Sequence, residues 1–219
     1  MKKAERRAYT FEVRAEETEG IARLEGRAIL YNSRTNIGRF DEIIEPGALN
    51  DTDLRDVPFF ANHNINSIPL ARSRNNNENS TMQLILDDEG LGIRADLDIE
   101  NNAEARALYS AVERGDITGM SFMMIGVKDK WEGARSEHPL RHITGIGRIG
   151  EVSAVNFPAY AQSSIESRDH SDALDSALES LESAIAEEEE EERAQQSAER
   201  RTAALERLNK LIHGGSENE

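Results

Sequence analysis

The feature that most constrains this fold is a succession of short strand-like segments in the first 168 residues, each ended by a turn. The clearest is 81–99, where two apolar runs flank the turn at 87–90, a pattern typical of a β-hairpin. Many short strands of this kind favour an antiparallel barrel or sandwich. The other strand-like segments are 8–32, 57–64, 119–127 and 140–157.

Two segments of the same region have helical spacing. Pro46 suits the first turn of a brief helix over 45–56. The stretch 100–117 is a clearer helix, because Asn102 can cap its start and Gly115 sits where a left-handed C-cap belongs. We therefore predict a mainly β domain with packed helices, an α+β fold.

The composition changes abruptly after about residue 168. Residues 170–219 contain 14 acidic and 5 basic side chains, a net charge of −9, and the remaining residues carry −7 of the total of −16. Six glutamates at 187–192 separate two groups of leucine and isoleucine at helical spacing, and we expect the helix to fray there because like charges four residues apart repel. We predict a domain over 1–168 and, over 169–219, an acidic, coiled-coil-like and partly disordered extension.

Charge and composition exclude several classes of protein. The basic face that nucleic-acid binding requires is missing from the sequence. The chain has no cysteine, which excludes disulfides and thiolate sites and fits a reducing compartment. No apolar stretch follows the charged N-terminus as in a secretory signal, and none reaches the length of a membrane span. We expect a soluble, intracellular protein that binds neither nucleic acid nor membranes.

A single serine, Ser121, lies within the apolar strand 119–127. A buried hydroxyl needs a partner, so Ser121 either bonds a neighbouring backbone carbonyl or reacts as a nucleophile. A nucleophile needs a base and a third group that orients the base. His63, in an Asn-rich turn, has the properties of that base, and Glu151, at the start of a Val-rich strand, those of the orienting carboxylate.

Two further histidines, His138 and His142, are four residues apart. On a strand this spacing separates them by roughly 13 Å, too far to share one ion. We therefore predict no metal site and no cofactor. His142 remains an alternative third member of a catalytic triad.

Taken together, six sequence blocks in this order resemble the capsid-maturation (prohead) serine proteases of tailed bacteriophages, which are related to the herpesvirus assemblin protease. The resemblance covers about residues 10–165. One departure is that Met123 or Met124 stands where the family usually has a glycine. The blocks are EGRAILYN, IIEPGAL, VPFFANHNINSIPLARS, DDEGLGIRADL, AVERGDITGMSFMM and GEVSAVNFPAY.

The resemblance implies an assemblin-like antiparallel β-barrel, here followed by a long acidic C-terminal helix. It implies Ser121 as nucleophile, His63 as general base and Glu151 as third member; in the herpesvirus relatives the third member is a histidine, which corresponds to His142. The sequence does not place the oxyanion donors, and residues 145–148 are a candidate loop for them.

The family further implies a function, partners and a location. Such a protease cuts scaffold sequences from the major capsid protein, and commonly itself, inside the immature capsid (prohead) in the host cytoplasm. We expect a homodimer or higher oligomer. The alternative is a non-enzymatic scaffold or assembly factor with a degenerate protease fold.

Overall fold

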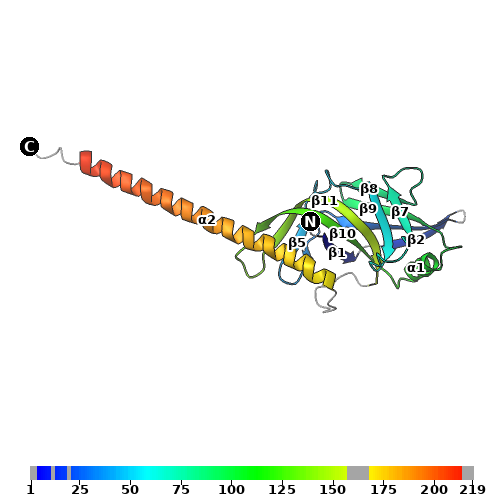
Figure 1. The fold of residues 1–219 in the computed structure, drawn as a ribbon. Helices are drawn as coiled ribbons and strands as arrows, with labels where there is room; N and C mark the ends of the chain where they lie inside the picture. The colour runs from blue at the N-terminus through cyan, green and yellow to red at the C-terminus, as the bar shows by residue number, and fades with distance from the viewer. Residues whose placement is uncertain (1–3, 11–12, 19–20, 157–167, 214–219) are drawn as a thin grey trace, which may run out of the picture. The chain divides into compact units, whose positions relative to one another are not determined.

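The computed structural model describes residues 4–10, 13–18, 21–156 and 168–213 (Figure 1). The chain divides into two compact units, Met1–Leu178 and Glu179–Glu219. The boundary predicted at residue 168 is the start of the final helix, whereas the first compact unit continues to Leu178.

Two sheets make up the β part of the fold, and β11 is the central strand of the larger one. Residues 140–143 at its start pair parallel with β5, and residues 152–154 near its end pair parallel with β6. Its other side pairs antiparallel with β10. The larger sheet has the order β1 (Ala4–Thr10), β10 (Gly119–Glu132), β11 (Leu140–Val155), β5 (Asp41–Ile44) and β4 (Thr35–Asn36), with β6 (Asp56–Ala61) on β11 and β7 (Ala71–Arg74) on β6. The smaller sheet has the order β2 (Val13–Thr18), β3 (Ile21–Leu30), β9 (Gly90–Leu97) and β8 (Met82–Asp87).

The mainly β fold with two helices is confirmed, but the predicted closed antiparallel barrel is wrong. Both sheets are open, because their outer strands pair on one side only. Two parallel pairings also replace the expected antiparallel ones, since β5 and β6 both follow the direction of β11. One core nevertheless joins the sheets, with Phe122 of β10, Leu24 of β3 and Ile93 of β9 in the same buried cluster.

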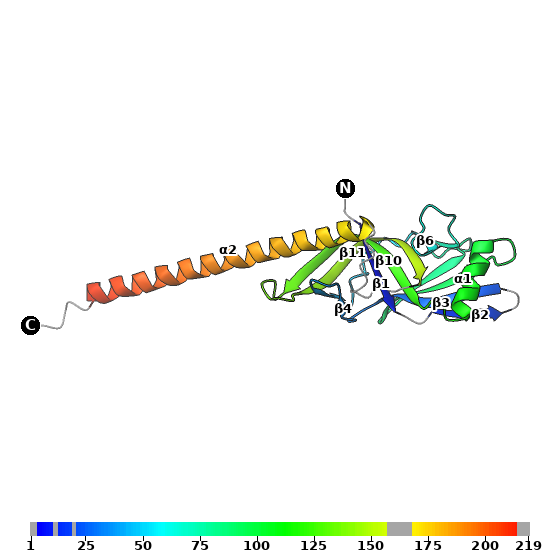
Figure 2. The same cartoon turned by 90° about the horizontal axis from the view of Figure 1, so that it is seen from below.

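Helix α1 (Ala103–Glu113) confirms the helix predicted over 100–117. The side chain of Asn102 accepts hydrogen bonds from the amides of Glu104 and Ala105, which satisfies two donors that a helix start leaves open. Gly115 has a φ of 77°, as expected of the residue that ends a helix. The helix packs against β2, β3 and β9 with an apolar face (Figure 2), formed by Ala105, Leu108, Tyr109 and Val112.

The brief helix predicted over 45–56 is absent, and turns replace it. Gly47 has a φ of 87°, which a right-handed helix cannot contain. The amides of Ala48, Asn50 and Thr52 each donate to the carbonyl three residues earlier, so the chain makes successive turns.

Helix α2 (Arg168–His213) is 46 residues long and continues through the glutamates at 187–192. The expected fraying is therefore wrong. Each like-charge pair costs only about 0.2–0.5 kcal/mol, and glutamate has a high helix propensity that offsets this cost. Beyond the glutamates, Leu205 and Leu208 remain exposed. In the described segments no helix is both long and apolar enough to cross a membrane.

A buried ionic network fixes the N-terminal strand to the larger sheet. Arg7 Nε lies 2.5 Å from Glu42 Oε1, and Arg141 Nη1 lies 2.7 Å from Glu5 Oε2 and 3.1 Å from Glu42 Oε2. These four side chains are at least 94% buried, and Asp129 completes the network through Arg141. Burial opposes ionisation of Glu42, but the charges and hydrogen bonds of the two arginines outweigh it and lower the pKa of Glu42.

We predict that Glu42→Gln destabilises the protein by about 3 kcal/mol at neutral pH, because it leaves buried arginine charge without its partner. A carboxylate with a lowered pKa stabilises the fold above its unfolded pKa of 4.5, and this contribution is lost as the pH falls through the lowered value. The difference between variant and wild type should therefore shrink in acid. Urea unfolding from pH 3 to 7 measures it, with Asp96→Asn, in the exposed pair with Arg23, as a control that should change stability by less than about 1 kcal/mol. A constant difference at all pH values would contradict the prediction.

Candidate active site

The candidate site lies on neighbouring strands of the larger sheet (Figure 1), on one face of β10 and β11. Side chains alternate along a strand, so Met120 and Phe122 enter the core while Ser121 points to the opposite face. Ser121 stands directly opposite Ser153, and the next pair on that face is Met123 and Glu151. A β-bulge follows this pair, where Gly150 is the extra residue of β11.

His63 reaches the same face from the turn after β6. Because β6 runs parallel to the end of β11, the turn that follows it lies beside the site. His63 Nδ1 lies 2.7 Å from Oε1 of Glu151. The carboxylate is buried, whereas the imidazole is 24% exposed. A carboxylate at this distance requires a proton on Nδ1, which leaves the lone pair of Nε2 available as a base.

The turn that presents His63 is held by two asparagines. Asn62 and His63 both have left-handed backbone conformations, with φ values of 47° and 59°. Asn62 Oδ1 accepts a hydrogen bond from the amide of Asn156 at 3.0 Å, and the Asn62 amide donates to the carbonyl of Ala154 at 2.9 Å. The two bonds attach the turn to the end of β11. A strained histidine held in this way is typical of functional sites.

We predict that Asn62→Ala destabilises the protein by about 2 kcal/mol, because alanine tolerates the left-handed region poorly and the bond to Asn156 is lost. Asn62→Gly loses the same bond but adopts a positive φ easily, so its cost should be about half as large. Urea denaturation midpoints of the two variants test this. An alanine variant at least as stable as the glycine variant would show that the backbone of this turn is not strained.

Ser121 itself is fully buried and bonded to the backbone. Its hydroxyl donates to the carbonyl oxygen of Arg7, on the neighbouring strand β1, at 2.6 Å. Among the described residues, no hydrogen bond links Ser121 to His63. Two interpretations of this hydroxyl were drawn from the sequence, a bond to a backbone carbonyl or a nucleophile. The structure shows the bond to a backbone carbonyl. It also places Ser121 one strand away from the His63–Glu151 pair.

Two residues near the site were not singled out from the sequence. Ser153 Oγ donates to Oε2 of Glu151 at 2.6 Å, and Arg6 Nε lies 3.6 Å from Oε1 of the same carboxylate. Ser153 stands in the block that contains Glu151, at the i+2 position that shares a strand face, so its proximity could have been read from the sequence. Nothing in the sequence indicates the position of Arg6, because it depends on the pairing of β1 with β10.

The alternative third member, His142, lies elsewhere on β11. It pairs in the sheet with Lys130, and its two ring nitrogens face Glu45 at 3.0 Å and Glu132 at 3.3 Å. Ser153 lies eleven positions further along the same strand, roughly 36 Å away at ~3.3 Å per residue. Residues 145–148, expected to form an oxyanion loop, are part of β11 and pair with 125–128. They are not a loop, because β11 continues through them and pairs there with β10.

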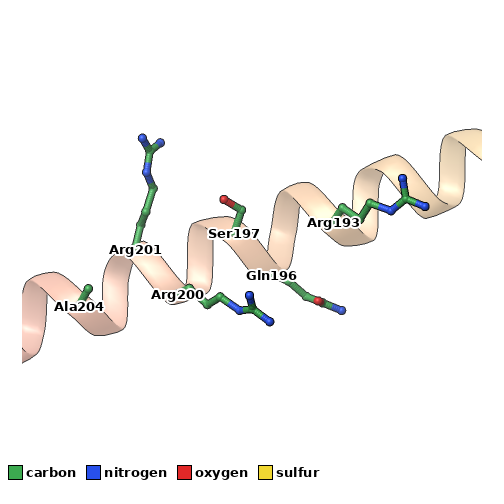
Figure 3. A pocket seen from close by; sticks show the side chains of 6 residues that line it. All are labelled: Arg193, Gln196, Ser197, Arg200, Arg201 and Ala204. Carbon is green, nitrogen blue, oxygen red and sulfur yellow. The ribbon is translucent and has the colours of Figure 1, made fainter.

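A depression along α2 offers no catalytic side chains of this kind. Figure 3 shows a shallow depression along α2 whose lining side chains project from successive turns of one helix and include neither a histidine nor a carboxylate. Within the described residues, no three histidine or acidic side chains gather in a way that could hold a metal ion. The depression is lined by Arg193, Gln196, Ser197, Arg200, Arg201 and Ala204.

Comparisons with known proteins identify the family of this chain. The chain is similar to the structure of the bacteriophage T4 capsid assembly protease, with 14% identity, a TM-score of 0.37, and coverage of 69% of this chain and 98% of that one. No curated protein matches it significantly. The model of the caudovirus prohead serine proteases matches residues 9–176, a span that includes Ser121, His63 and Glu151. The chain therefore belongs to the caudovirus prohead serine protease family.

Proposed function

We propose that this chain is an endopeptidase that removes scaffold sequences from the major capsid protein during capsid maturation. Ser121 is the nucleophile, His63 the general base and Glu151 the group that orients the base. The observation that carries the proposal is the 2.7 Å contact between His63 and Glu151, formed next to Ser121 within the region that matches the family. Membership of the family supports serine protease chemistry.

The first chemical step requires Ser121 to leave its backbone partner. Rotation about χ1 moves the hydroxyl between staggered positions, and the proposal requires a rotation that releases the Arg7 carbonyl and directs Oγ toward His63 Nε2. The lost bond is worth about 1 kcal/mol, small beside a catalytic barrier. The contact with Arg7 therefore represents a resting state of the nucleophile.

Acyl transfer then follows from the roles of the three side chains. As Ser121 Oγ bonds the scissile carbonyl carbon, its proton passes to His63 Nε2. Glu151 stabilises the resulting imidazolium, and His63 gives the proton to the leaving amine as the peptide C–N bond breaks. Water repeats the sequence on the acyl-enzyme, returns the proton to Ser121 and releases the carboxylic acid product.

This proposal includes the setting of the reaction. The enzyme acts inside the prohead in the host cell, cuts its own chain as well as the capsid protein, and assembles as a dimer or higher oligomer through α2. Co-expression with the major capsid protein, followed by mass spectrometry of the products, tests the substrate assignment. Intact capsid protein and an intact protease chain would reject it.

A second candidate function is a non-enzymatic assembly factor. The full burial of Ser121 and its bond to Arg7 favour this second function, since buried serines without a catalytic role show both features. The two functions predict different results when the protein is treated with a serine-reactive phosphonate, which modifies an activated serine. Modification of Ser121 in the folded protein supports the enzyme, and complete resistance together with intact capsid protein supports the assembly factor.

We predict that the second compact unit, 179–219, is needed for delivery and not for chemistry. It contains no described side chain of the candidate site, and its exposed Leu205 and Leu208 suit pairing with another helix. A chain ending at Leu178 should cut a peptide substrate within about threefold of the full-length rate. Its incorporation into assembling proheads should fall at least about tenfold, measured by immunoblotting of purified proheads.

The comparison requires that both chains be folded, which circular dichroism of the β domain establishes. If the shortened chain is folded but cannot cut the peptide, α2 is part of the active enzyme, for example through dimerisation. Normal incorporation of the shortened chain would instead remove the proposed role in delivery.

A further inference from the structure

Ser153 is a fully buried hydroxyl that the mechanism above does not use. It lies two residues after Glu151 on the same face of β11, and its Oγ donates to Glu151 Oε2 at 2.6 Å. Both oxygens of the buried carboxylate are therefore engaged, Oε2 by Ser153 and Oε1 by His63. The hydroxyl thus contacts the carboxylate and not the base.

From this arrangement we infer that Ser153 is a positioning residue of the catalytic site. Its hydroxyl fixes the carboxylate of Glu151 in the one orientation that directs Oε1 to His63. The inference rests on the proposed function, in which Glu151 orients His63. It adds a fourth side chain, which acts on the base only through the carboxylate.

The physical basis is the freedom of a glutamate carboxylate. Its terminal torsion has a broad, roughly twofold profile and holds the group only loosely. Arg6 Nε lies 3.6 Å from Oε1, close enough to draw a rotated carboxylate away from His63 and toward its own guanidinium. Ser153 opposes this rotation, because turning the carboxylate would break a hydrogen bond between two buried groups.

Backbone pairing makes the position of Ser153 rigid. The residue is paired with Ser121 of β10 on one side and with Phe60 of β6 on the other. The strand that places the hydroxyl against Glu151 thus also fixes the distance between the carboxylate and the nucleophile. Small displacements in such a site can cost about 100-fold in rate.

Three substitutions separate the hydroxyl from the volume of the side chain. Ser153→Ala removes the hydroxyl without adding atoms, and Ser153→Thr and Ser153→Val have nearly the same shape but differ in the hydroxyl. We expect kcat to fall about 10–100-fold in the alanine and valine variants, with KM within twofold of wild type. The threonine variant should keep at least about a third of the wild-type kcat.

A second readout does not depend on activity. The Nδ1 proton of His63 should give a far-downfield NMR resonance in the wild type and in the threonine variant, and this resonance should be lost in the alanine and valine variants. Ser73→Ala is the matched control, because Ser73 is a buried serine on β7 that bonds Asn76 at 3.0 Å, outside the site. It should leave kcat and the resonance unchanged.

The outcomes are distinguishable. Wild-type kcat and an unchanged resonance in the alanine and valine variants would overturn the role of Ser153, as would a threonine variant no better than valine. Phosphonate modification of Ser153 in place of Ser121 would make Ser153 the nucleophile and also overturn it. If the wild type cuts no substrate, the proposed function fails, and the His63 resonance alone then decides whether Ser153 holds the carboxylate.

Discussion

Ser121→Ala should leave a folded protein that no longer cuts its substrate. The substitution removes the proposed nucleophile but no volume from the apolar core, since Ser121 lies on the opposite face of β10 from Phe122. We expect the rate of cleavage of the capsid protein to fall by about 10⁴-fold or more, as for loss of a triad nucleophile. The cost in stability should be about 1 kcal/mol, because one hydrogen bond to Arg7 is lost.

The measurement is cleavage of purified major capsid protein followed by mass spectrometry, with urea unfolding as the test of folding. Ser73→Ala is again the control, since it removes a buried serine hydroxyl away from the site. Cleavage at the wild-type rate by a folded Ser121→Ala protein would end the serine protease mechanism. If the activity of the wild-type sample then proved to come from a contaminating enzyme, the non-enzymatic assembly factor would be the favoured function.

Glu151→Gln should reduce kcat by about 10²–10⁴-fold, whereas His142→Ala should leave it within about twofold. The amide cannot stabilise an imidazolium as the carboxylate does, and it can offer its NH₂ group to His63 and favour the wrong tautomer. His142 instead faces Glu45 and Glu132, at the opposite end of β11 from Ser153. The 2.7 Å contact between His63 and Glu151 is the basis for the expected difference.

Both variants should be compared in one assay with the same peptide, so that substrate quality does not affect the ratio. The informative result is which of the two substitutions lowers kcat more. A nearly normal Glu151→Gln protein together with an inactive His142→Ala protein would assign the third position to His142. It would also leave Ser153 without a catalytic partner.

Elements whose pattern is local could be predicted from the sequence. The hairpin over 81–99 is present as β8 and β9, and Gly90, at its turn, has a φ of 139° and no room for a Cβ beside the Ile29 carbonyl. Helix α1 and its cap at Asn102 also follow from neighbouring residues. The open sheets could not be predicted in this way, because they depend on which distant strands pair with β11.

In the candidate site, too, some features could be predicted from the sequence and others could not. Ser121, His63 and Glu151 were proposed from their sequence blocks, and the structure brings His63 and Glu151 into contact. Spacing alone could not have joined them, since they are 88 residues apart. The carbonyl of Arg7 and the guanidinium of Arg6 belong to a strand whose position is decided by the whole sheet, so no local pattern predicted either contact.

The ionic network of β1 has a consequence for the order in which the chain folds. Glu5 and Arg7 find their partners, Arg141 and Glu42, only after β11 and β5 have come together. Before that, docking β1 would bury charge without compensation, and it would also close the longest loop of the domain. We therefore expect β1 to join the larger sheet after β5 and β11 have come together. The hydrogen bond between Ser121 and the Arg7 carbonyl would then form late in folding, with the docking of β1.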